Sequence, residues 1–180
     1  MTALPNGGQA PENATLRAMP NTVDGVLRVV PTDEALALTK KEAAAILEIA
    51  FLAIAADHKL RDEEIEAFRG VAGRLKDLSS GSAKTSGPMG DRELEAILDS
   101  FSADMDRAVA DERLLVVAKD LDRAEVRALA YKVAYALALC DLDTSDEEFE
   151  FDLQLVDALN LSQEDVGALE DDVLAAFNEG

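Results

Sequence analysis

Basic residues, aromatic residues and cysteine are all scarce in this sequence, and each shortage excludes a class of protein. The 180 residues include no Trp, one His and one Cys, and 17 Lys and Arg stand against 37 Asp and Glu, which gives a net charge of −20. A lone Cys140 cannot form an internal disulfide and suits a reducing compartment. So large an excess of acid repels phosphate backbones and anionic lipid, which argues against binding nucleic acid or docking directly on a membrane.

Long hydrophobic runs are also missing. No apolar run approaches the roughly 20 residues that cross a bilayer, and Met1 to Pro20 has no hydrophobic core of a secretion signal. We therefore expect a cytoplasmic protein with no direct membrane insertion. From Val133 to Gly180 there is no Lys, Arg or His. This charge favours metal cations or a basic protein face as partners, unless it serves solubility alone.

Proline and glycine divide the chain. Residues 1–31 hold four of the five prolines and are predicted to be a disordered or extended leader, with Val26–Val30 as a short extended segment. Residues 32–180 are predicted to form a single domain, interrupted by a flexible linker near 78–90 that is rich in Ser and Gly.

The domain has the pattern of an all-α bundle. Ala and Leu dominate, apolar residues recur at helical spacing, and no strand pattern is convincing. Thr39 followed by Glu42 is a capping box that opens the first helix of the domain. The spacing predicts about seven helices, over residues 39–56, 62–76, 91–101, 105–119, 126–138, 145–159 and 162–177.

One unit of helix, acidic turn and helix occurs twice. In each copy an apolar helix ends at an Asp, and a Glu pair follows at the sixth and seventh positions after it; the residues are Asp57, Glu63 and Glu64, then Asp141, Glu147 and Glu148. The repeat indicates an internal duplication, and we expect the two hairpins to be related by a pseudo-twofold axis. Whether the two turns face each other is left open by the sequence.

These six carboxylates are the candidate metal ligands. A carboxylate at the end of a helix needs compensation, which a cation or the N–H groups of the next helix can supply. Oxygen ligands suit Ca²⁺, Mg²⁺ or Mn²⁺. Capping alone explains Asp and Glu at these positions equally well. The second turn is not an EF-hand, because Asp146 and Asp152 stand where that loop needs Gly and Glu.

No other motif points to chemistry. His58, the only histidine, is interpreted as an exposed turn residue beside Asp57, and Cys140 as a small core residue. The sequence has no nucleophile elbow, phosphate-binding loop, dinucleotide fingerprint or pair of histidines for zinc. We therefore expect a protein that is not an enzyme; acid–base catalysis by paired carboxylates would need a cleft with shifted pKa values.

The repeated turns resemble those of the TerB-like family of tellurite-resistance and stress-response proteins. The matching residues are Ala55, Ala56, Asp57, Lys59, Leu60, Glu63 and Glu64 in the first copy, and Asp141, Ser145, Glu147 and Glu148 in the second. The resemblance covers roughly 41–177 and implies a pseudo-twofold helical bundle with a divalent-cation site at Asp57, Glu64, Asp141 and Glu148. His58 stands where the family has Gly.

The resemblance implies a cation-binding scaffold or regulatory module in a stress-response assembly. Through its partners in such an assembly the protein would be peripheral at the inner membrane. The alternative is a purely structural acidic protein that docks a basic partner without metal. Either role is compatible with a homo-oligomer. The first predicts stabilisation by a divalent ion, and the second predicts salt-sensitive association that ignores chelators.

Overall fold

The protein is all-helical over the part of the chain that its computed structural model describes, residues 22–32, 36–56, 59–80, 89–103, 107–140 and 146–179, with backbone alone for 107–110. Eight helices and no strand lie in these ranges, which confirms the all-α prediction. The helices are α2 (Thr22–Val29), α3 (Lys40–Ala55), α4 (Asp62–Ser80), α5 (Asp91–Ala103), α6 (Arg107–Ala118), α7 (Ala124–Ala138), α8 (Asp146–Ala158) and α9 (Gln163–Asn178).

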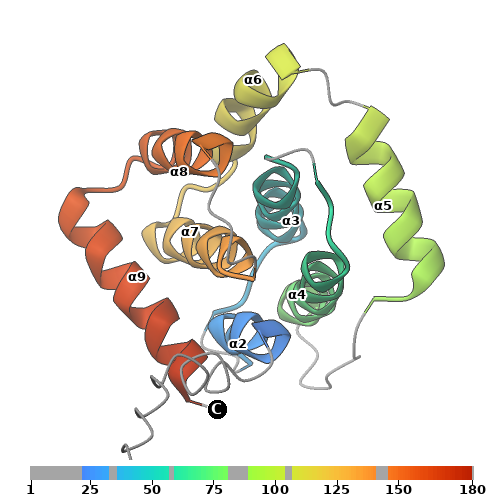
Figure 1. Cartoon of the computed structure of the whole chain (residues 1–180), viewed down its shortest axis with the longest axis horizontal. Helices are drawn as coiled ribbons and strands as arrows, with labels where there is room; N and C mark the ends of the chain where they lie inside the picture. The colour runs from blue at the N-terminus through green and yellow to red at the C-terminus, as the bar shows by residue number, and fades with distance from the viewer. Residues whose placement is uncertain are drawn as a thin grey trace, which may run out of the picture.

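Helices α3 and α7 pack against each other at the centre of the bundle (Figure 1). On one side α4 packs on α3, and α2 packs on α4, α7 and α9. On the other side α6 packs on α3, and α8 packs on α6 and α7. Helix α5 lies at the outside, beyond α3 and α4 (Figure 1). The central position of α3 explains its sequence, because a helix surrounded by others is apolar on nearly every face.

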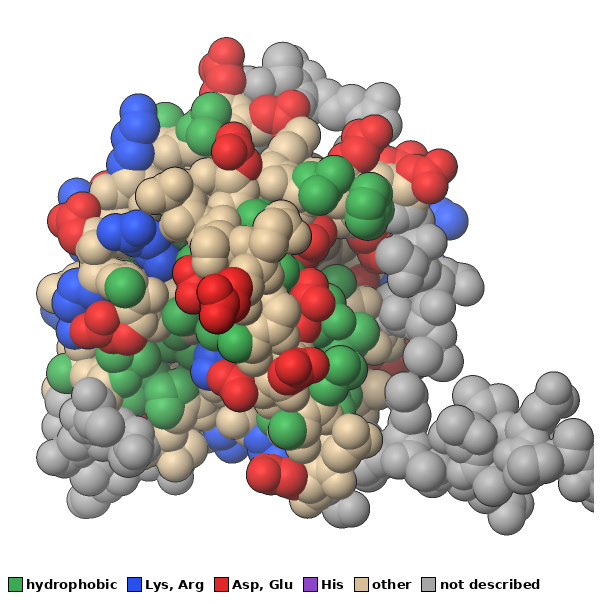
Figure 2. Space-filling view, turned by 90° about the vertical axis from the view of Figure 1, so that its left-hand side faces the viewer, with side chains coloured by type: hydrophobic (Ala, Val, Ile, Leu, Met, Phe, Trp, Pro, Cys, Tyr) green, Lys and Arg blue, Asp and Glu red, His purple; other side chains and the backbone are tan. Residues whose placement is uncertain are grey.

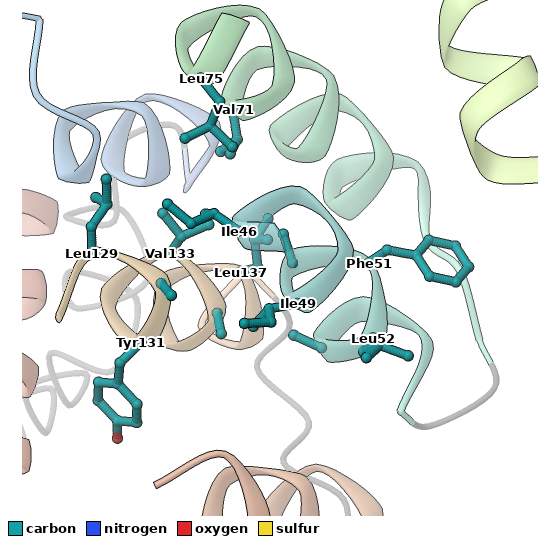
Figure 3. Close-up of a cluster of buried hydrophobic side chains, with 14 of the residues drawn as sticks. Ile46, Ile49, Phe51, Leu52, Val71, Leu75, Leu129, Tyr131, Val133 and Leu137 are labelled. Atoms are coloured by element: carbon teal, nitrogen blue, oxygen red, sulfur yellow. The ribbon is translucent and has the colours of Figure 1, made fainter. Parts of the chain in front are cut away.

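The core is built from aliphatic side chains of α3, α4 and α7 (Figure 3). Ile46 and Ile49 of α3 are fully buried and lie near Val133 and Leu137 of α7 (Figure 3). Phe51 points outward from α3 and contacts Phe68 and Phe101, with ring centroids 6.5 and 5.1 Å away. Edge-on and tilted aromatic pairs of this kind add to the free energy of burial.

The duplicated unit corresponds to the helix pairs α3–α4 and α7–α8. Helices α3 and α7 begin at Lys40 and Ala124, and helices α4 and α8 begin at Asp62 and Asp146. The separation in sequence is the same for both pairs of starts. Each pair therefore keeps the same register between its two helices and the acidic turn that joins them. The pseudo-twofold relation of the two hairpins stays a prediction.

Helix α2 is the eighth helix, and it differs from the interpretation of residues 1–31 as a leader. Thr22–Val29 is helical, not extended, and Val26, Val29 and Val30 are buried. Residues 1–21 lie outside the described residues. The valines have β propensity, but they are spaced for one face of a helix, and burial of that face on α4, α7 and α9 outweighs local preference.

Close approach and hydrogen bonds fasten α2 in place. A Cβ at Gly70 of α4 would lie 2.5 Å from Cδ2 of Leu27, so any larger residue there would require the Leu27 side chain to move. The Arg74 guanidinium of α4 donates to the carbonyl oxygen of Leu27 and, at 3.4 Å, to that of Val30. A cation at the negative end of α2 is favourable. Burial lowers the pKa of Arg74.

The predicted capping box is confirmed, and it extends into an ion pair. The Thr39 hydroxyl accepts from Glu42 N–H at 3.1 Å, and Thr39 N–H donates to Glu42 Oε2 at 2.9 Å. Arg123, which precedes α7, donates to both carboxylate oxygens of Glu42 at 2.9 and 2.7 Å and to the carbonyl of Ala37 at 2.7 Å. Hydrogen bonding from Arg123 holds the pKa of Glu42 at about 2. One carboxylate thus joins the N-terminal ends of α3 and α7.

We expect Glu42→Ala to lower the free energy of unfolding by about 1–2 kcal/mol at pH 7, because a cap and a charged hydrogen bond are both lost. The native pKa is depressed to about 2, so the stabilisation is present above the unfolded value of about 4.3 and disappears as the pH falls toward 2. Urea unfolding at pH 7 and pH 3 measures this, with the exposed Glu95→Ala as control. An equal loss from Glu42→Ala at both pH values would contradict the assignment.

The predicted linker near 78–90 is shorter than expected. Helix α4 continues to Ser80, where the Ser79 and Ser80 hydroxyls donate to the carbonyls of Lys76 and Asp77 at 2.9 and 3.1 Å. These bonds let serine occupy a last helical turn. Residues 81–88 lie outside the described residues, and Met89 is buried again.

Helix α8 ends in a complete C-terminal cap. Asn160 has a φ of 53°, a left-handed conformation that Asn tolerates better than most residues. Leu161 N–H donates to the carbonyl of Val156 at 3.1 Å and Asn160 N–H to that of Asp157 at 3.0 Å. This pair of bonds is a Schellman motif, and it turns the chain sharply from α8 into α9.

Candidate functional site

The six predicted metal ligands divide into three groups in the structure. Asp57 and Asp141 lie outside the described residues, as does His58. Glu63 and Glu147, in the first turns of α4 and α8, are exposed. Glu64 and Glu148 follow them and are buried, with exposed fractions of 2% and 8%. In both copies, therefore, the first glutamate of the pair is exposed and the second is buried.

The burial of Glu64 has a local cause. Its Oε2 accepts a hydrogen bond from the N–H of Arg61, the residue before α4, at 3.1 Å. This is the bond that Glu42 makes to Thr39, so Glu64 closes the first turn of its helix as half of a capping box. A glutamate is seldom buried unless its charge is paired or hydrogen-bonded. Capping is thus one role of Glu64.

Within the residues that the structure describes, no three Asp, Glu, His or Cys side chains lie close enough to hold a metal ion. Of their main packing partners, helices α4 and α8 share only α7: α4 packs on α2, α3 and α7, whereas α8 packs on α6 and α7. Glu63, Glu64, Glu147 and Glu148 alone therefore do not form one joint site. Any site at these turns depends on Asp57 and Asp141, which the described residues do not include.

Cys140, at the end of α7, is half-buried, and its Sγ lies 4.0 Å from the carbonyl oxygen of Thr22. It packs against the hydrophobic core, as expected of a small core residue.

A second constellation, which the sequence analysis missed, joins α7, α8 and α9. The hydroxyl of the fully buried Tyr131 lies 3.1 Å from Oδ1 of Asp152 and 3.0 Å from Oε1 of Glu170. Tyr131 points away from α3, on the side of α7 opposite the aliphatic core (Figure 3). Its ring stacks on that of Tyr135, with centroids 6.0 Å apart and planes 12° apart. We call Tyr131, Tyr135, Asp152 and Glu170 the tyrosine–carboxylate cluster.

The cluster has too few protons for its oxygens when both carboxylates are ionised. A tyrosine hydroxyl donates one hydrogen bond, so Tyr131 can satisfy Asp152 or Glu170, and the other contact needs a proton on a carboxyl group. Burial, together with the negative charge of Glu170, raises the pKa of Asp152 against the opposing hydrogen bond from Tyr131. Burial and the two carboxylates raise the pKa of Tyr131 well above its ordinary value. The cluster favours retention of a proton on Asp152, and it ties α8 and α9 to α7.

One signal in the sequence could have revealed the cluster. The only two tyrosines of the chain, Tyr131 and Tyr135, are one helical turn apart on a helix that is otherwise rich in Ala, Val and Leu. A buried tyrosine hydroxyl needs a partner, and the acidic helices that follow could provide one. Which of their many carboxylates lie opposite depends on how α8 and α9 pack, and helical spacing alone does not give that.

Comparison with known proteins adds no relative: the chain matches no protein-family model, no curated protein and no solved structure. Among the described residues, no helix is long and apolar enough to span a membrane.

Proposed function

We propose that this protein is a non-enzymatic, TerB-like helical module that binds divalent cations at its two acidic turns and acts as a scaffold or regulatory component of a stress-response or other protein assembly. One observation supports this best. Glu64 and Glu148 occupy the same position in two copies of one unit, and both are buried where an acidic turn meets the next helix. Burial of a carboxylate at the same register position in both copies supports a role that the two turns share, and cation binding is the role we propose.

Each turn would bind its own ion. In the first, Asp57 and the Glu63–Glu64 pair supply carboxylate oxygens, and in the second Asp141 and the Glu147–Glu148 pair do so. Two unit charges about 4 Å apart repel by roughly 1–4 kcal/mol at effective dielectric constants of 80 to 20. A divalent ion removes that repulsion, and oxygen ligation selects Ca²⁺, Mg²⁺ or Mn²⁺.

The expected result of metal removal is a loss of thermal stability. An ion at 100 times its dissociation constant adds about 2.7 kcal/mol, which is several degrees in Tm for a chain of this size. Thermal unfolding of EDTA-treated protein, with and without each ion, measures the shift, and we expect Asp57→Asn/Asp141→Asn to abolish it.

The repeat supplies a matched control. Glu66 and Glu150 lie two residues beyond Glu64 and Glu148, and both are exposed. Glu66→Gln/Glu150→Gln removes the same charge and should keep the full response to the ion. If no ion shifts the wild type, or if both double variants respond alike, the carboxylates at the turns act only as caps and surface charge.

The second candidate function is metal-free docking of a basic protein partner. Its support is the charge of α8 and α9, which carry acidic side chains and no Lys or Arg. Association through such a face weakens as the salt concentration rises and is unchanged by EDTA. Cation-dependent assembly, by contrast, is weakened by the chelator. The two candidates are therefore separable in one titration.

A further inference from the structure

Apolar side chains lie exposed among the acidic residues of α8 and α9. Phe149 and Leu153 of α8 have exposed fractions of 60% and 52%, and Leu174 of α9 has one of 43%. Single exposed hydrophobic residues are ordinary on protein surfaces, but several large ones on neighbouring helices are typical of a docking site. We call these three residues the apolar ridge.

Each member of the ridge lies within about one helical turn of a carboxylate of the tyrosine–carboxylate cluster. Asp152 and Glu170 both reach the Tyr131 hydroxyl, so α8 and α9 lie side by side at that point. Phe149 and Leu153 are one turn apart on α8 and flank Asp152, and Leu174 lies one turn beyond Glu170 on α9. The ridge therefore borders the cluster from both helices.

The charge that α8 and α9 themselves place around the ridge is of one sign. Its exposed neighbours on α8 and α9 that ionise are all acidic: Asp146, Glu147, Glu150, Asp157, Glu164, Asp165, Asp171 and Asp172. On this face acidic side chains cover the centre, hydrophobic ones lie between them, and Lys and Arg lie mostly toward the left and lower edges (Figure 2). A second copy of the chain would bring the same negative charge against it.

From this we infer that the apolar ridge docks a basic amphipathic helix of another protein, with apolar side chains on Phe149, Leu153 and Leu174 and Lys or Arg against the surrounding carboxylates. The hydrophobic contact supplies affinity, and the charges supply orientation and rate of association. This inference rests on the proposed scaffold role and is independent of cation binding.

The test uses full-length protein in EDTA and a fluorescent amphipathic peptide of Leu and Lys, about 18 residues long. A Gly and Lys peptide of equal charge serves as comparison. We expect the Leu–Lys peptide to bind at least tenfold more tightly than the Gly–Lys peptide. We also expect Phe149→Ser/Leu153→Ser to weaken its binding about tenfold or more, since each side chain loses a buried contact.

The matched control is Leu60→Ser. Leu60 has the same exposed fraction as Leu174, 43%, but it precedes α4 and is not part of α8 or α9, so its substitution should leave binding unchanged. Phe149 and Leu153 are more than half exposed, and unfolding curves check that their variants fold.

Three results overturn the inference: no binding of the Leu–Lys peptide, equal binding of both peptides, or equal weakening by Leu60→Ser. A dimer in sedimentation that Phe149→Ser/Leu153→Ser dissociates also overturns it, in favour of a second copy. Because EDTA is present throughout, peptide binding stands or fails separately from the cation response.

Discussion

A chain that begins at Pro31, and so lacks α2, is expected to be about 5 kcal/mol or more less stable than one that begins at Thr22. Val26, Val29 and Val30 are buried, and full burial of such a side chain contributes about 1.5–3 kcal/mol, as an upper estimate. Since whole domains are stable by only about 5–15 kcal/mol, the shorter chain should be largely unfolded or molten at 37 °C.

The loss extends beyond the valines. Removal of α2 uncovers the faces of α4, α7 and α9 on which it packs. It also leaves Arg74 without the carbonyls of Leu27 and Val30, and Gly70 without the side chain that fills the space beside it. A cavity and a partly buried charge without its partners add to the cost.

Comparison of the two truncated chains isolates α2, because both lack residues 1–21. Urea unfolding followed by circular dichroism gives the difference in free energy. Equal midpoints and slopes for the two chains would show that α2 contributes nothing to stability, as the interpretation of residues 1–31 as a leader requires.

Tyr131→Ala is expected to lower the free energy of unfolding by about 3–5 kcal/mol, the range for removing a large buried aromatic ring. Tyr131→Phe keeps the ring and removes the hydroxyl that Asp152 and Glu170 share, so we expect it to cost about 1–3 kcal/mol at pH 7. The difference between the two variants separates packing of the ring from the hydrogen bonds of the tyrosine–carboxylate cluster.

The cost of Tyr131→Phe should depend on pH. Because the pKa of Asp152 is raised in the folded protein, the native state holds a proton that the unfolded state releases as the pH rises above about 3.9. Stability from this group therefore falls as the pH rises from there through the native pKa. The hydrogen bond from the Tyr131 hydroxyl opposes this rise in the pKa of Asp152. Without that hydroxyl, the loss of folding stability at neutral pH grows. Once the pH is low enough for Asp152 to keep its proton in both the folded and the unfolded chain, this loss is absent and the cost of Tyr131→Phe should shrink.

Asp152→Asn is the diagnostic companion variant. The amide of this variant donates to the hydroxyl oxygen of Tyr131, and the Tyr131 hydroxyl donates to Glu170. Both contacts are then satisfied without a titrating proton. We expect it to be at least as stable as the wild type at pH 7 and to flatten the pH dependence between 4 and 7. A marked loss of stability at pH 7, or an unchanged pH dependence, would contradict the shared-proton description.

Local patterns were sufficient to predict most of the helices. The capping box at Thr39 and the Ser162 cap, whose hydroxyl accepts from Asp165 N–H at 3.1 Å, mark helix starts through chemistry confined to one turn. The seven predicted helices correspond to α3–α9. The repeated acidic turns, likewise, are visible because their register is a property of sequence alone.

Features that depend on distant partners were missed. Val26 and Val29 indicate a helix only when α4, α7 and α9 are present to cover them. The capping role of Glu64, by contrast, is local: it is one of the two alternatives that the sequence offers, and the hydrogen bond from Arg61 N–H confirms it. The Tyr131 contacts join three helices, and no spacing rule specifies which carboxylate lies opposite a tyrosine on another helix.

The packing of α2 also determines when the protein can fold. On a ribosome α2 emerges before α4, α7 and α9, and its Gly25 fits against Phe177, near the C-terminal end of α9. The hairpin of α3 and α4 can form early from local contacts, but the side of the bundle that α2 closes must wait for the whole of α9 to be synthesised. Such long-range closure slows folding and exposes apolar surface in the meantime. Nascent chains that stop before α9 should therefore depend on chaperones or be degraded.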